Sequence, residues 1–220
     1  MQFVRVQTLL DGVAPLVERL TRQLANGKNV TWLIPGGSNI PLSVAVMAQL
    51  DDGLTAGLTI MLSDERYGPV GHADSNTFQL AEAGFQSKQA NLLPVLHDGL
   101  SLEETSRRYA ADFEDRIRSN DIIIGQFGMG ADGHIAGILP QSPAVGSADL
   151  ATGYDAGNFV RVTLTPKALQ QITVGYVFAF GEAKRDQLER LQSQAIELDL
   201  QPVQIIKQLP EAFVYNDQLV

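Results

Sequence analysis

The chain has 220 residues, of which 45% are hydrophobic and 19% are charged, a balance typical of a globular protein rather than a disordered one. It contains no cysteine, which excludes disulfide bonds, thiolate catalysis and cysteine metal sites. The net charge of −9 argues against a broad nucleic-acid-binding surface, but a small anionic ligand can still be held by a few arranged donors.

The length suits a single domain over residues 1–220, and no change of composition marks a linker. The N-terminal segment lacks the pattern of a signal peptide, and no apolar stretch approaches the roughly 20 residues that span a bilayer. We therefore expect a cytoplasmic protein without nucleic-acid or membrane partners, whose ligands are small metabolites. Protein partners and oligomeric state cannot be predicted from the sequence.

Strand-like apolar runs alternate with helical segments along the chain. Residues 29–35 predict a buried strand, residues 41–50 a helix with Pro41 in its first turn, and residues 58–62 a second strand. A helix follows over residues 101–119, because Ser101 and Glu104 form a capping-box pattern. Tyr109, Phe113 and Ile117 give that helix one core-facing stripe.

Two further strands are predicted at residues 122–127 and 176–180, and a helix at 182–192. This alternation predicts an α/β fold with a mostly parallel sheet covered by helices on both faces. In such sheets, ligands bind beyond the carboxyl ends of the strands. The most unusual polar segments of the chain follow strands and should meet at that edge.

The first such segment is Pro-Gly-Gly-Ser-Asn at residues 35–39, between a strand and a helix. Gly36 and Gly37 allow the backbone to approach a ligand closely, and the N-terminus of the following helix favours an anion. Ser38 and Asn39 could add side-chain donors. An ordinary strand-to-helix turn, capped by Ser38 or Asn39, is the alternative.

The second segment is Ser-Asp-Glu-Arg-Tyr at residues 63–67. Arg66 has the planar fork that matches phosphate or carboxylate oxygens, while Asp64 or Glu65 could orient a neighbour or hold substrate hydroxyls. The alternative is a solvated turn with a salt bridge that adds little stability. His72 follows in the same segment and could be an ordinary loop residue without a functional role.

The third segment, Gly-Met-Gly-Ala-Asp-Gly-His at residues 128–134, carries the sharpest signal. Its three glycines permit a tight loop that includes Gly130, and a turn at Gly133 could bring Asp132 and His134 to one site. Histidine has an unperturbed pKa near 6.5, so it can exchange a proton near neutral pH. A hydrogen-bonded structural histidine is the alternative.

Two cations complete the candidate set. Arg161 opens the segment RVTLTP, and Lys184 lies just past Gly181 in the first turn of a predicted helix, although either could be an ordinary surface charge. The three histidines show no metal-ligand spacing, and neither glycine segment forms a dinucleotide fingerprint. We therefore expect neither a metal nor a cofactor.

Taken together, the segments PGGSNIP, SDERYGPVGHADSN and GMGADGHIAGILP resemble those of the 6-phosphogluconolactonases and their relatives, the glucosamine-6-phosphate deaminases. RVTLTP and GEAK add fainter support, and the matches keep the order of the family from Trp32 to Lys184.

This resemblance implies a three-layer α/β fold of Rossmann-like type with its site at the strand ends. It also implies a metal-independent hydrolase that opens 6-phospho-D-glucono-1,5-lactone in the oxidative pentose phosphate pathway. It implies that His134 is the general base and that Asp132 holds or tunes its imidazole. The same resemblance implies that six residues together hold the substrate phosphate and polarise the reacting end of the lactone. They are Gly36, Gly37, Ser38, Arg66, Arg161 and Lys184.

Departures from the family pattern define the alternatives. The first loop has Ser-Asn-Ile-Pro and is one residue longer than the usual glycine loop of the family. Ile135 and Ala136 match the deaminases, but the glutamate those enzymes use is missing, with no acid before Asp149. Lactonase is therefore favoured over deaminase. A non-catalytic sugar-phosphate sensor is the third reading, against which the Asp132–His134 unit argues.

Overall fold

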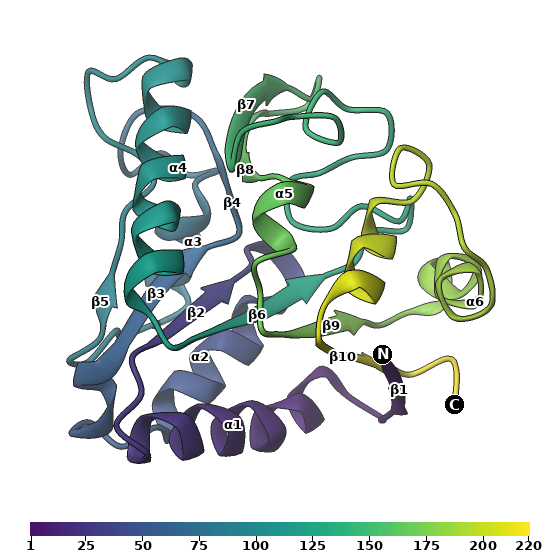
Figure 1. Cartoon of the computed structure of the whole chain (residues 1–220), viewed down its shortest axis with the longest axis horizontal. Helices are drawn as coiled ribbons and strands as arrows, with labels where there is room; N and C mark the ends of the chain where they lie inside the picture. The colour runs from purple at the N-terminus through teal and green to yellow at the C-terminus, as the bar shows by residue number, and fades with distance from the viewer.

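The computed structural model describes residues 1–220 and is built around a seven-stranded parallel sheet (Figure 1). Across the sheet the strands lie in the order β1 (Gln2–Arg5), β10 (Glu211–Asn216), β9 (Val174–Ala179), β6 (Ile122–Gly128), β2 (Val30–Ile34), β3 (Leu58–Leu62) and β5 (Asn91–Leu92). Every residue of the central strands β2, β3 and β9 is buried, as expected for a parallel sheet covered on both faces.

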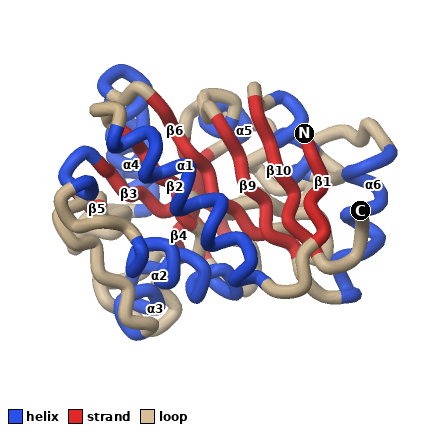
Figure 2. Tube along the Cα trace, turned by 90° about the horizontal axis from the view of Figure 1, so that it is seen from below, coloured by secondary structure: helices blue, strands red, loops and turns tan.

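Helices cover both faces of this sheet, which confirms the three-layer α/β prediction. The helices are α1 (Val13–Ala25), α2 (Ile40–Gln49), α3 (Asn76–Glu82), α4 (Leu102–Ser119), α5 (Pro166–Leu169) and α6 (Arg185–Ser193). Figure 2 views the sheet through α1 and α2, whereas α4 and α5 lie on the opposite face in Figure 1. None of the helices is both long and apolar enough to cross a membrane.

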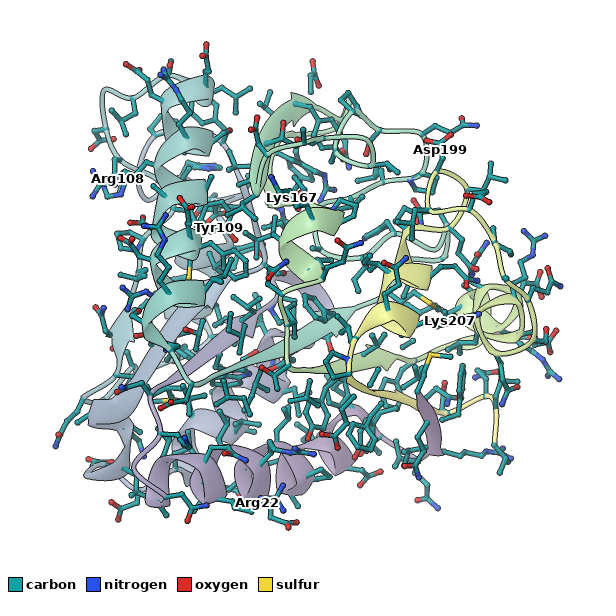
Figure 3. The ribbon with its side chains drawn as sticks, in the orientation of Figure 1. Arg22, Arg108, Tyr109, Lys167, Asp199 and Lys207 are labelled. Carbon is teal, nitrogen blue, oxygen red and sulfur yellow. The ribbon has the colours of Figure 1, made fainter.

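The predicted stripe of the long helix faces the core. Tyr109 points from α4 toward the sheet while its neighbour Arg108 points outward (Figure 3). The Tyr109 hydroxyl donates to the carbonyl of Leu62 at the end of β3, so α4 is tied to the central strands as well as packed on them. Ser101 and Glu104 make the predicted capping box that begins this helix.

One part of the fold differs from the sequence prediction. Residues 64–66, expected in a loop, form the strand β4 (Asp64–Arg66) of a separate antiparallel sheet with β8 (Val160–Leu164) and β7 (Ala151–Asp155). Charged residues rarely favour strands, but pairing with β8 supplies the hydrogen bonds that the local sequence does not suggest. The junction is Ser63, whose N–H donates to the Ile34 carbonyl of the main sheet.

Short 3₁₀ turns connect these elements, and two of them reach the functional edge. They are η1 (Leu9–Gly12), η2 (Gly37–Asn39), η3 (Leu54–Gly57), η4 (Glu182–Lys184) and η5 (Pro202–Gln208). The predicted helix at 182–192 therefore begins as η4 and continues as α6. Gly181 allows this entry because its φ of 98° is one that L side chains rarely adopt.

Candidate active site

A pocket of about 380 Å³ lies beyond the carboxyl ends of β2, β3, β6 and β9. The lining comes from the ends of these strands and the segments that follow them, including β4 and the first residue of α3, and from the start of β8 with the turn before it. Its lining residues are Pro35, Gly36, Gly37, Ser38, Asn39, Asp64, Arg66, Asn76, Gly128, Met129, Gly130, His134, Ala136, Asn158, Phe159, Arg161 and Lys184. The structure therefore gathers all three glycine-rich or charged segments at the edge that the topology predicts.

One side of the pocket, here called the histidine side, consists of residues 130–134 after β6. Asp132 Oδ1 lies 2.7 Å from His134 Nδ1 and also accepts the His134 backbone N–H at 3.1 Å. When the Nδ1–H donates to this carboxylate, Nε2 keeps its lone pair and can accept a proton. The imidazole is about one third exposed, so water can reach it.

The same contact sets the charge of Asp132. Partial burial acts to raise its pKa, but the hydrogen bonds and charge of His134 outweigh burial and lower the pKa from 3.8 to about 2. Asp132 therefore stays ionised near neutral pH and acts on the imidazole as a fixed negative partner.

Glycines are required on the histidine side for reasons of space and backbone conformation. A Cβ on Gly130 would lie 2.1 Å from His134 Nδ1 and 2.4 Å from Asp132 Oδ1. Gly133 has a φ of 85°, which L side chains rarely adopt. The turn that joins Asp132 to His134 is therefore closed to larger residues at two positions.

A network of glutamines supports this turn from behind. Gln201 is almost fully buried and its Nε2 donates to the carbonyl and the Oε1 of Gln187, both at 2.8 Å. Gln204 Nε2 in turn donates to Gln201 Oε1 at 2.6 Å. Gly133 packs against Gln187 and Gln201, and its carbonyl accepts the N–H of Val203 at 3.0 Å. The network thus fixes the backbone that carries His134.

The opposite side of the pocket, here called the arginine side, consists of Asp64, Arg66, Phe159 and Arg161. Antiparallel pairing of β4 with β8 sets Arg66 directly opposite Arg161. Arg161 Nη1 lies 3.5 Å from Asp64 Oδ2, and Arg66 Nη1 donates to the Asp74 carbonyl at 2.8 Å. Both side chains line the pocket.

Asp64 is the only carboxylate that lines the pocket. Burial raises its pKa, and the charges of Arg161 and Arg66 oppose that rise. Arg66, Arg161 and Lys184 are the three cations of the lining. Three cations against one carboxyl group give the lining an excess of positive groups, which suits a phosphate.

Glu65, which the sequence offered as a substrate-binding residue, does not line the pocket. Its two carboxylate oxygens accept the backbone N–H groups of Arg66, Asn76 and Thr77 and the hydroxyls of Ser75 and Thr77, at 2.6–3.0 Å. This buried carboxylate joins β4 to the first turn of α3. Its place in the fold is structural.

The glycine loop after β2 forms the floor of the pocket. Gly36 is packed so tightly that a Cβ would lie 1.8 Å from Asn76 Oδ1, and Gly37 has a φ of 64°. The chain then enters η2 and α2, with Ser38 at the pocket and Asn39 almost fully buried beside Gly128. This arrangement presents a helix start to the pocket, as the sequence suggested.

Lys184 reaches the pocket from η4. Burial lowers the pKa of its ammonium group, and the charge of Asp217 acts in the opposite direction. Asp217 also accepts the N–H of Gly181, which fixes the start of the turn that carries Lys184.

The pocket contains residues that the sequence did not single out as binding residues, chiefly Asn76, Asn158 and Phe159. Phe159 lies in a turn, where an aromatic residue gives no motif. Asn76 lies in the segment SDERYGPVGHADSN, which resembles the family, so among these three residues it alone could have been found from the sequence. The described residues contain no group of three or more His, Cys, Asp or Glu side chains placed to hold a metal ion.

Comparison with protein families gives a match over residues 6–214 to the model described as glucosamine-6-phosphate isomerases/6-phosphogluconolactonase. A 6-phosphogluconolactonase of Neisseria meningitidis serogroup A is 30% identical over 193 residues, covering 81% of this chain and 80% of that protein. A 6-phosphogluconolactonase of Caulobacter vibrioides is 26% identical over 196 residues, with 83% of each chain covered.

Solved structures share the fold at lower sequence identity. The crystal structure of a 6-phosphogluconolactonase from Shewanella baltica superimposes with a TM-score of 0.82 at 20% identity, covering 98% of this chain and 97% of the other. A 6-phosphogluconolactonase from Thermotoga maritima gives a TM-score of 0.81 at 21% identity and covers 98% of both chains. At these identities the likeness concerns the fold.

Proposed function

We propose that this chain, which belongs to the glucosamine-6-phosphate isomerase/6-phosphogluconolactonase family, hydrolyses 6-phospho-D-glucono-1,5-lactone to 6-phosphogluconate. The observation that carries this proposal is one pocket with two different sides. A histidine and three cations line the same small pocket, so one bound substrate can meet both a base and an anion site.

The proposed reaction uses His134 as general base. His134 Nε2 takes a proton from water, whose oxygen attacks the lactone carbonyl and forms a tetrahedral oxyanion. Collapse of this intermediate breaks the bond to the ring oxygen, which leaves as a hydroxyl after it receives the proton from His134. Asp132 holds the imidazole and stabilises its charged form in between. Base catalysis of this kind contributes about 10²–10⁴-fold.

Substrate binding falls to the other side and the floor of the pocket. Arg66, Arg161 and Lys184 supply charge for the phosphate, and the glycine loop with Gly36, Gly37 and Ser38 adds backbone and hydroxyl donors. A phosphate held away from the reacting carbonyl orients the lactone toward His134. Donors directed at the developing oxyanion would each add about 10²–10³-fold.

Names of the relatives support the substrate, and a role in the oxidative pentose phosphate pathway follows from that substrate as part of the same proposal. A cytoplasmic location stays a prediction from the sequence. Loop residues 135–141 after His134 contain no acid that could assist amino-sugar ring opening, which favours lactone hydrolysis over deamination.

Hydrolysis of freshly generated 6-phosphogluconolactone, measured against its spontaneous rate, tests the proposal. The native protein should accelerate the reaction, and His134→Ala should lower kcat by about 10²–10⁴-fold. His97→Ala is the matched control, because His97 lies outside the pocket. Ammonia release from glucosamine-6-phosphate without lactone hydrolysis would replace the proposal by the deaminase, and binding without turnover would replace it by a sensor.

A further inference from the structure

Two like charges stand opposite each other on the arginine side. Arg66 and Arg161 are register partners on β4 and β8, and like charges in that position destabilise a sheet. Asp64 is the one carboxylate beside them, at 3.5 Å from Arg161. The Nε atoms of both arginines are buried and have no hydrogen-bond partner. Hydrogen bonds and ion pairs alone therefore leave these two guanidiniums incompletely fixed.

The ring of Phe159 contacts both guanidiniums. The Arg66 guanidinium carbon lies 5.1 Å from the ring centroid, and that of Arg161 lies 5.9 Å from it. Both distances fall within the range of about 6 Å for attraction between a cation and an aromatic face. Phe159 is also the only Phe, Tyr or Trp side chain that lines the pocket.

The position of the Phe159 ring restricts how the two guanidiniums can be oriented. Its negative face attracts both cations, while the same face repels an anion. A bound phosphate must therefore lie where the guanidinium N–H groups point away from the ring. Attraction to one ring therefore holds both guanidiniums at the same pocket and offsets part of their mutual repulsion.

We propose that Phe159 is a positioning residue that holds Arg66 and Arg161 for the substrate phosphate and so sets the preference for phosphorylated over unphosphorylated lactones. The inference rests on the proposed function and deepens it. It concerns binding, and it predicts an effect on KM for the phosphorylated lactone with little effect on kcat.

Simple packing would be a different role for the same side chain. Phe159 closes the turn between β7 and β8, where its carbonyl accepts the Ala156 N–H at 2.9 Å. That role needs the backbone and some apolar bulk, which leucine supplies as well. Leucine and tyrosine therefore separate the two roles, because only tyrosine keeps an aromatic face.

The experiment compares Phe159→Leu and Phe159→Tyr on 6-phosphogluconolactone and on unphosphorylated glucono-1,5-lactone. In the leucine variant, the ratio of the two kcat/KM values should fall about 5- to 30-fold, through a higher KM for the phosphorylated lactone. The tyrosine variant should stay within about twofold of the native ratio. A native ratio in the leucine variant, or an equal fall in both variants, would overturn the proposal.

A control and a binding measurement complete the design. Phe85→Leu removes a partly buried ring outside the pocket and should keep the native ratio. Calorimetric binding of 6-phosphogluconate needs no turnover, so it separates the two proposals. If the native protein binds this compound without hydrolysing the lactone, the proposed function fails, while weaker binding in the leucine variant alone still supports Phe159. If the native protein hydrolyses the lactone and Phe159→Leu binds 6-phosphogluconate as tightly as the native protein does, the Phe159 proposal fails and the proposed function stands.

Discussion

The histidine side and the arginine side of the pocket are built in opposite ways. The histidine side is one short turn, in which neighbouring residues bond to each other and glycines leave the space they need. The arginine side joins strands β4 and β8, whose paired residues Arg66 and Arg161 are far apart in the chain. A base can be held locally, whereas a wall of like charges needs the tertiary structure to keep it in place.

This difference predicts that adding a single methyl group on the histidine side is enough to abolish most of the activity. Gly130→Ala should lower kcat by at least about 100-fold, because its methyl group would occupy the space of the imidazole and displace it from Asp132. Lactone hydrolysis and the melting temperature are measured together, so that lost activity is not mistaken for lost folding. Gly146→Ala is the control, since a Cβ there meets nothing within 4 Å.

On the arginine side the corresponding change should act on binding. Arg161→Met keeps much of the side-chain length but removes the charge and the donors that we propose bind the phosphate. We expect KM for the phosphorylated lactone to rise about 10- to 100-fold, with a smaller change in kcat. Arg185→Met, which removes an exposed arginine paired with Glu189, should leave KM as it is. A fall in kcat at constant KM for Arg161→Met would contradict this assignment.

The glutamine network behind the histidine side should have a smaller effect than Gly130, and it should also act on kcat. Gln201→Leu removes the hydrogen bonds to Gln187 and Gln204 and loosens the packing against Gly133. The expected result is a kcat about tenfold lower at similar KM, with a loss of about 1–3 kcal/mol in the free energy of unfolding. Steady-state kinetics and urea unfolding check both, and a change confined to KM would exclude the supporting role.

The smallest expected effect concerns acid stability. The pKa of Asp132 is about 2 in the folded protein and 3.8 without its contacts, so its ionised form stabilises the fold above about pH 4. This contribution is lost as the pH falls from about 4 through about 2. Native protein and Asp132→Asn are compared by urea unfolding along that range. Their difference in unfolding free energy should shrink on acidification, and a difference that grows would have the wrong sign.

The contrast between the two sides also explains what the sequence could reveal. Buried strands such as β2, β3 and β6 follow from continuous apolar runs, and the family match supports the same fold. The closeness of Asp132 and His134 follows from their spacing across a glycine. Local patterns of this kind depend on few residues, so they can be read directly.

Other features depend on pairings that no local pattern records. The strand at Asp64–Arg66 forms because β8 is available to pair with it, and Phe159 reaches the pocket through that same pairing. Glu65 looked equivalent to Asp64 in the sequence, but strand alternation turns neighbouring side chains to opposite faces. One carboxylate therefore lines the pocket, and the other binds the start of α3.

In the proposed function, the two sides of the pocket divide the work between chemistry and phosphate binding. The most direct test measures kcat/KM of His134→Ala and Arg66→Met on 6-phosphogluconolactone and on glucono-1,5-lactone. We expect His134→Ala to lose activity on both lactones alike, and Arg66→Met to lose activity selectively on the phosphorylated lactone. Equal losses on both lactones in the arginine variant would contradict this division.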